Sequence, residues 1–195
     1  MPIINNNFNV WEEGIVKTGV ATNTNWNGFY FYMSNSGTWT LQRVIDSPNN
    51  QLRYSFGAFV TSADITVNTG DFVEFSPTII EGYDWLPFHT EPFTFSFWVK
   101  SNKTGIYCVS FHNSNDDRSY TVEYTINSAN NWEYKTIVVT AITSGGTWVF
   151  DEGIGMTIYF VLVVGAGYQT STPGTWEAAN KFGTSNQVNL GDAVN

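Results

Sequence analysis

The segment Phe93–Lys100, FTFSFWVK, constrains the fold of this chain more than any other feature, because aromatic and polar residues alternate along it. In an extended strand successive side chains point to opposite faces. One face therefore carries Phe93, Phe95, Phe97 and Val99, and the other carries Thr94, Ser96, Trp98 and Lys100. This pattern is typical of a strand with one face in a hydrophobic core and the other toward solvent.

The rest of the chain shows the same period of two, and clusters of Gly, Asn, Asp and Ser interrupt it roughly every eight to twelve residues, as in β-sandwiches. Helical periodicity is almost absent. The expected strands are Phe29–Met33, Trp39–Arg43, Leu52–Phe59, Asp71–Ile80, Phe93–Lys100, Gly105–Asn113, Ser119–Ile126, Glu133–Ala141 and Gly155–Val164. We therefore predict an all-β fold, a two-sheet antiparallel β-sandwich with about nine strands and little or no helix.

Length and charge narrow the possible functions. At 195 residues the chain is expected to form a single domain, residues 1–195, with a full two-sheet core. Its net charge of −9 lacks the clustered Lys and Arg that phosphate contacts need, so neither nucleic acid nor an anionic membrane is an expected partner. The start, MPIINNNF, predicts no secretory signal, and the single cysteine, Cys108, excludes an intrachain disulfide.

Residues that could carry out catalysis or bind a metal form no recognised motif. The chain lacks GxSxG, HExxH, a phosphate-binding glycine loop and CxxC. His89 and His112 are interpreted as loop or strand-end residues rather than a metal pair, and Asp116 and Asp117 as turn caps rather than ligands. Three carboxylates lie near Trp85 in the sequence, namely Glu81, Asp84 and Glu91, but nothing fixes the separation that a glycosidase requires. We expect no enzyme activity, catalytic residue, metal or cofactor.

Aromatic residues are the better candidates for a binding site. Eight tryptophans and ten tyrosines exceed what a core of this size needs, so some are expected at the surface. Exposed rings beside amides and carboxylates can stack on sugars while the polar groups bind the hydroxyls. The candidate ligand-binding residues are Trp98, and Trp176 with Tyr168 and Asn180 in the irregular stretch Gly165–Asn189, where one short helical turn is expected near Trp176–Lys181. The alternative is a second core layer or a subunit contact.

Several segments, in order along the chain, carry a family resemblance. The region Ile79–Thr136 contains IEGYDW, FTFSFWVKSNKTGIYCVSFHN, DRSY and WEYKT. The opening Ile4–Gly14 is similar to the family's first motif, with Asn6 in place of glycine, and the likeness continues from Tyr168 to Leu190. Together these segments resemble a domain widespread in virion proteins of tailed bacteriophages. The resemblance implies a jelly roll akin to galactose-binding-like and carbohydrate-binding modules, without a catalytic residue. It also implies one further C-terminal strand after the segment that ends at Leu190, so we expect either that this sequence is truncated or that another chain completes the sheet.

The resemblance and the composition together favour one function and leave others open. We expect a non-enzymatic virion structural protein of the fibre or appendage type that binds host glycan. The alternative is a capsid decoration, cement or tail-joining protein without sugar binding. A polysaccharide depolymerase, a third hypothesis, needs two close carboxylates in a cleft. Expected partners are other virion proteins of the capsid or tail and a host surface glycan, in a homo-oligomer such as a trimer. The expected location is the virion surface, after synthesis in the host cytoplasm without a signal peptide.

Overall fold

The structure is a computed structural model that describes residues 8, 9, 11–77 and 79–194. Residues 4–7 and 10 of the first family motif lie outside these ranges. The strands are β1 (Val16–Val20), β2 (Thr24–Trp26), β3 (Phe29–Ser34), β4 (Thr38–Val44), β5 (Ser55–Ser62), β6 (Phe72–Ser76), β7 (Ile79–Glu81), β8 (Phe93–Val99), β9 (Gly105–His112), β10 (Ser119–Ile126), β11 (Glu133–Val139), β12 (Ile154–Val164) and β13 (Trp176–Glu177). The helices are α1 (Gly82–Trp85), η1 (Leu86–Phe88) and η2 (Ala166–Tyr168).

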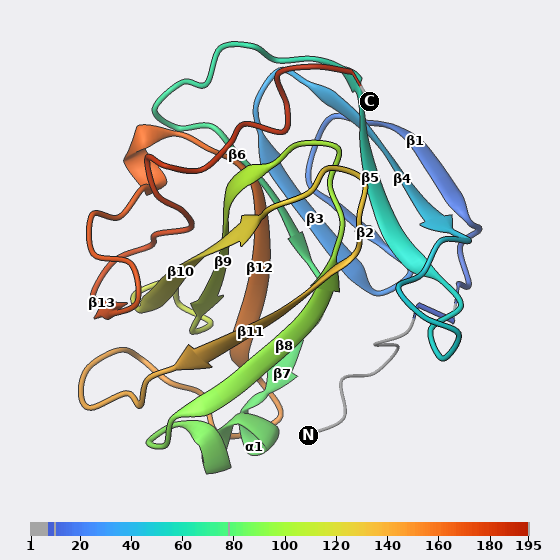
Figure 1. Ribbon diagram of the computed structural model, residues 1–195. Helices are drawn as coiled ribbons and strands as arrows, with labels where there is room; N and C mark the ends of the chain where they lie inside the picture. The colour runs from blue at the N-terminus through green and yellow to red at the C-terminus, as the bar shows by residue number, and fades with distance from the viewer. Residues whose placement is uncertain (1–7, 10, 78, 195) are drawn as a thin grey trace.

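The strands form one large sheet that two smaller sheets cover on one face. The large sheet has the order β13-β10-β9-β12-β6-β3-β2, with β7 also paired to β12, and the smaller sheets are β1-β4-β5 and β11-β8. Figure 1 shows the β8–β11 pair in front of β9 and β12. Strand pairing within the sheets is antiparallel, for example between β8 and β11 and between β9 and β10. The prediction of an all-β antiparallel sandwich is confirmed.

Two details of that prediction are wrong. The second layer is not one sheet but two, because β5 pairs only with β4 and β8 only with β11 among the described strands. The strand expected at Asp71–Ile80 is divided into β6 and β7, and Pro77, which has no backbone N–H to donate, lies between them. Three further strands, β1, β2 and β13, were not predicted from the sequence. They are short and contain polar residues, so alternation with a period of two is weak in them.

The phenylalanines of β8 pack into the core as their alternation predicted. The rings of Phe93 and Phe95 lie 5.7 and 5.5 Å from the ring of Phe111 in β9, and the ring of Phe97 lies 4.8 Å from that of Phe160 in β12. Stacking the β8–β11 pair on the large sheet thus buries the apolar face of β8. A second part of the core forms where β4 and β5 pack on β3 and β6, with Trp39 fully buried.

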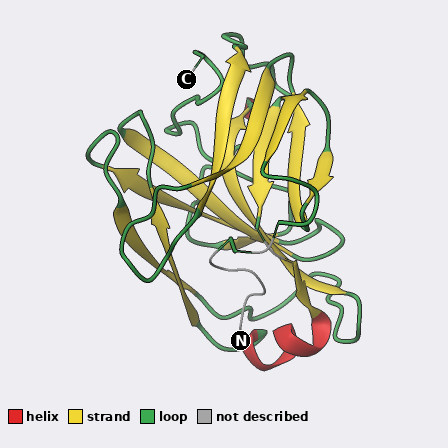
Figure 2. Cartoon of the chain, turned by 90° about the vertical axis from the view of Figure 1, so that its right-hand side faces the viewer, coloured by secondary structure: helices red, strands yellow, loops and turns green. Residues whose placement is uncertain are grey.

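The C-terminal segment, residues 165–191, covers part of the other face of the large sheet. The Ser119 hydroxyl donates to the Ala179 carbonyl at 2.6 Å, and the Thr121 hydroxyl donates to the Lys181 carbonyl at 2.7 Å. The helical turn expected near Trp176–Lys181 is wrong, because Trp176 and Glu177 pair as β13 with β10. Figure 2 shows the helical segment that contains α1 at one end of the molecule. No helix in the described ranges has the length and apolar character needed to cross a membrane.

Gly165 gives a first testable prediction about this segment. Its N–H donates to the Asp71 carbonyl at 2.7 Å, and a Cβ placed on it would lie 2.0 Å from the Asn68 carbonyl oxygen. We expect Gly165→Ala to lower the free energy of unfolding by about 1–3 kcal/mol through this clash. Gly70→Ala is the matched control, because its Cβ would meet no atom within 4 Å. Urea denaturation of both variants checks the difference, and equal stabilities would contradict this account of the turn.

Candidate functional site

Two concave features lie on opposite faces of the large sheet. The first, which we call the β5–β8 groove, has a volume of about 800 Å³ and runs between the two smaller sheets. β5 supplies one wall, through Ser55–Phe59, and β8 supplies the other, through Phe95–Val99. Phe75 and Phe160 line the groove from the large sheet. The groove therefore exists because the second layer of the sandwich is divided.

Three side chains at the edge of the groove hold one another in place. Lys100 forms an ion pair with Asp46, and the Trp132 indole N–H donates to Asp46 Oδ1 at 2.9 Å. The Lys100 ammonium also lies 5.6 Å from the centre of the Trp132 ring. Hydrogen bonds from Lys100 and Trp132 lower the pKa of Asp46 below its usual value. This edge thus presents a fixed carboxylate, an ammonium and an aromatic ring beside one another.

Trp98 lies on the outer side of β8 and also lines the groove. Its side chain is 39% exposed and packs against Tyr134, which is 56% exposed and lies directly opposite it in β11. The two ring centres are 5.1 Å apart. The structure thus places two adjacent, partly exposed aromatic rings at the groove, whereas the ligand-binding role of Trp98 stays a prediction.

The second feature, which we call the Glu74 pocket, lies on the other face of the large sheet, beside the C-terminal segment. It has a volume of about 330 Å³. It is lined by Tyr32, Phe72, Glu74, Ile79, Asn113, Ser114, Asp116, Ile154, Thr157, Tyr159, Tyr168, Asn180 and Phe182. Neighbouring residues in a strand point to opposite faces, which is why Phe75 lines the groove and Glu74 lines this pocket.

Of the three candidate residues in the stretch Gly165–Asn189, the structure brings two together in this pocket and places the third elsewhere. Tyr168 and Asn180 both line the Glu74 pocket. Trp176 does not, because its ring packs on Tyr120 at 5.2 Å and its indole N–H donates to the Thr140 carbonyl at 2.8 Å. The expected grouping of Trp176 with Tyr168 and Asn180 is therefore wrong, and Trp176 packs at the edge of the core.

Glu74 is the most unusual ionisable residue of the pocket. It is only 1% exposed, and its Oε1 has no hydrogen-bond partner among the described residues. Burial raises the pKa of Glu74 well above its usual value, and the nearby Asp116 raises it further. Strong desolvation of a carboxyl group in a concave site is a frequent property of functional residues.

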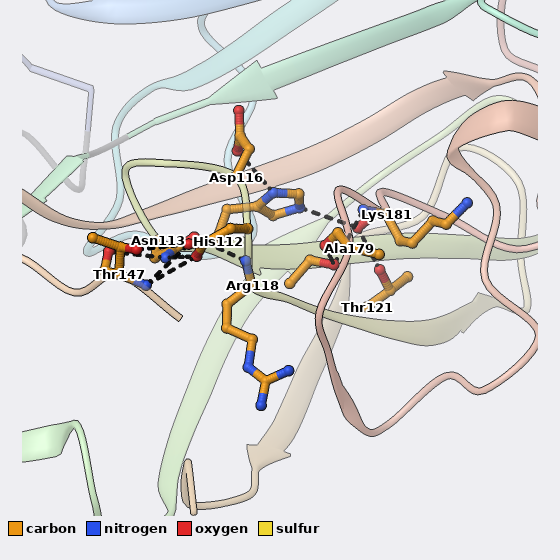
Figure 3. Close-up of polar contacts among 10 residues, drawn as sticks. His112, Asn113, Asp116, Arg118, Thr121, Thr147, Ala179 and Lys181 are labelled. Atoms are coloured by element: carbon orange, nitrogen blue, oxygen red, sulfur yellow. Dashed lines mark hydrogen bonds and ion pairs between the residues drawn. The ribbon is translucent and has the colours of Figure 1, made fainter. Parts of the chain in front are cut away.

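His112 connects Asp116 to the C-terminal segment (Figure 3). Its Nδ1 lies 3.1 Å from Asp116 Oδ1, and its Nε2 lies 3.1 Å from the Lys181 carbonyl oxygen. Both ring nitrogens of this buried histidine thus face oxygen acceptors, and the two contacts are both hydrogen bonds when the ring carries two N–H protons. The buried His112 side chain thus holds the partly exposed Asp116 carboxylate in a fixed orientation.

The loop that carries Asp116 is fixed by neighbouring polar residues. Asn113 Oδ1 accepts the Arg118 backbone N–H at 3.0 Å (Figure 3), and Asp117 accepts the Thr147 backbone N–H and hydroxyl. Asp116 itself has a positive φ of 52°, which Asp tolerates better than most residues. The predicted capping of this turn is carried out by Asn113, whereas Asp117 binds Thr147 of another loop and Asp116 faces His112 and the Glu74 pocket.

The sequence carries one signal for this pocket in addition to the predicted candidate residues. Glu74 is a charged residue inside the apolar run Phe72–Phe75, on a segment expected to be a strand. A buried acid with no partner in its own strand indicates a functional or paired role. The three carboxylates that were considered for a glycosidase site are all exposed, namely Glu81, Asp84 and Glu91. The two histidines do not form a pair, because His89 packs on Trp85, Trp148 and Phe150.

Comparison with known proteins finds similarity to solved structures. No family model and no curated protein matches the chain. The chain is similar to the enzymatically active domain of tailspike protein 4 from bacteriophage CBA120, with 18% identity and a TM-score of 0.40. The match covers 75% of this chain and 18% of the other. The expectation that this protein is not an enzyme is corrected by that neighbour, which is described as enzymatically active, although a TM-score of 0.40 assigns no activity in its place.

Proposed function

We propose that this protein is an appendage or fibre protein of a bacteriophage virion that binds host glycan in the β5–β8 groove. The sequence resemblance to a virion domain family supports the location of the protein on a bacteriophage virion. The observation that carries the binding role is the pair of exposed rings, Trp98 and Tyr134, beside the Asp46–Lys100–Trp132 cluster. Flat rings contact the apolar faces of sugars, and fixed polar groups bind the hydroxyls. A volume of about 800 Å³ lies within the range of ligand sites, roughly 300–1,000 Å³.

One observation favours a second candidate, a structural joining role without sugar binding. β5 and β8 are both edge strands of their sheets, and the groove lies between them. Edge strands can accept a further strand from another protein. A virion protein that supplied such a strand would fill the groove and leave no room for a glycan. Electron microscopy of the particle discriminates the two, because a position at every site of the capsid shell would contradict the fibre role.

A saccharide array probed with purified wild-type protein, Trp98→Ala and Tyr83→Ala tests the glycan role. We expect the wild type to bind a defined set of saccharides. Trp98→Ala should weaken binding about tenfold, equivalent to ~1.4 kcal/mol, because a stacking surface is lost. Tyr83→Ala is the matched control, an exposed aromatic residue of α1 that lines neither concavity, and should leave binding unchanged. Binding to no saccharide, or equal binding by Trp98→Ala and wild type, would contradict the proposal.

A further inference from the structure

The Glu74 pocket has an aromatic wall made from four separate parts of the chain. Tyr32 in β3 contacts Tyr159 in β12 at 5.9 Å between ring centres, and Tyr159 contacts Phe182 at 5.5 Å. Phe182 contacts Tyr168 at 5.2 Å, and Tyr168 contacts Phe72 in β6 at 5.3 Å. The rings therefore form a continuous series around the face of β6 that carries Glu74. Aromatic rings in such a series attract cations through their negative faces.

The pocket contains two buried side-chain oxygen atoms that accept no hydrogen bond from the described residues. Glu74 Oε1 and Asn180 Oδ1 are both buried without a hydrogen-bond partner among the described residues. Asp116 adds a second carboxylate, with its side chain 44% exposed. None of the described residues that line the pocket is Lys or Arg. A buried acceptor without a donor is costly, so a ligand that brings N–H donors and positive charge would complement these atoms.

We propose that the Glu74 pocket binds the primary ammonium group of a small polar ligand, such as an amino sugar with a free amine. The ammonium group donates to Glu74 Oε1 and Asn180 Oδ1 while the aromatic wall surrounds its charge. A quaternary ammonium group has no N–H to donate to these oxygens. Among the described residues, no group of three or more His, Cys, Asp or Glu side chains could hold a metal ion, so the two carboxylates of this pocket favour an ammonium group over a divalent cation.

This site is separate from the β5–β8 groove, because the two lie on opposite faces of the large sheet. Glu74 and Tyr159 line only the pocket, whereas their strand neighbours Phe75 and Phe160 line only the groove. The ammonium proposal therefore does not depend on the glycan proposal. Trp98→Ala is expected to leave ammonium binding unchanged, so each proposal can fail without the other.

Isothermal titration calorimetry of the full chain with D-glucosamine and D-glucose is the direct test, because the two sugars differ at one position, an ammonium in place of a hydroxyl. We expect glucosamine to bind at least about tenfold more tightly than glucose. Glu74→Gln should remove this preference, and Glu91→Gln, an exposed matched control, should keep it. Binding should also release a proton from Glu74. The measured heat should then vary with the ionisation enthalpy of the buffer in the wild type but not in Glu74→Gln.

A second pair of variants tests the aromatic wall without changing the charge of the pocket. Tyr32→Leu should weaken glucosamine binding about two- to thirtyfold, as expected for the loss of one cation–π contact of ~0.5–2 kcal/mol, whereas Tyr32→Phe should retain it. Equal affinity for glucose and glucosamine, or no effect of Glu74→Gln, would overturn the proposal. Binding of Ca²⁺ in competition with glucosamine would overturn the proposal in favour of a metal site. The absence of binding by both glucosamine and methylamine would also overturn the proposal.

Discussion

Phe111→Ala is expected to lower the free energy of unfolding by about 3–5 kcal/mol. Phe111 is fully buried in β9, and its ring contacts Phe93 and Phe95 in β8 and Tyr120 in β10. Its loss leaves a cavity where the β8–β11 pair packs on the large sheet, and a sheet of two strands has little stability of its own. Chemical denaturation followed by fluorescence gives the value.

Val138→Ala is the matched control for this experiment. Val138 lies on β11, in the same smaller sheet as β8, but its side chain is 62% exposed. We expect its loss to change stability by less than about 0.5 kcal/mol. A loss below about 1 kcal/mol for Phe111→Ala would mean that the β8–β11 pair does not depend on this contact.

The second large effect is a pH dependence of stability that originates in Glu74. Burial raises the pKa of Glu74 in the folded protein above the value of 4.5 that applies to the unfolded chain. Folding therefore favours the protonated form of the group. The stability that this form provides is fully present below pH 4.5 and is lost as the pH rises through the raised pKa of the folded state.

The comparison of wild type with Glu74→Gln isolates this effect, since the two proteins differ only in the ionisable carboxyl group at this position. Above pH 4.5 the stability of the wild type should fall relative to Glu74→Gln by about 1.4 kcal/mol per pH unit, until the folded-state pKa is reached. Urea denaturation from pH 4 to pH 8 measures the difference, with Glu91→Gln as an exposed control. A difference that stays constant over this range would show that Glu74 is not desolvated in the folded protein.

Local alternation explains why so much of the fold was predictable from the sequence. The pattern in Phe93–Lys100 predicted both the strand and its buried face, and the structure places Phe93, Phe95 and Phe97 against the large sheet. Ser119–Ile126 was predicted with the same bounds that β10 has. Such strands bury one face against a partner, which leaves a period-two signature in the sequence. β2, with three residues, is too short to leave one.

The candidate site was predictable only in part, because it depends on strand order. Tyr168 and Asn180 both line the Glu74 pocket, although their ligand-binding role stays a prediction, and Glu74 and Asp116 reach the same pocket through β6 and the loop after β9. Sequence periodicity shows which face a residue occupies and does not show which strands are neighbours. The division of the second layer into two sheets, which creates the β5–β8 groove, is likewise a property of strand pairing.

The central claim, that the β5–β8 groove binds glycan, is tested most directly by the indole N–H resonances of the tryptophans in a two-dimensional ¹H–¹⁵N spectrum. On titration with a saccharide selected from the array, the resonances of Trp98 and Trp132, which line the groove, should shift. Those of Trp26 and Trp85, which are buried in the two parts of the core and do not line the groove, should stay in place. Shifts confined to residues outside the groove, or no shift at all, would contradict the account.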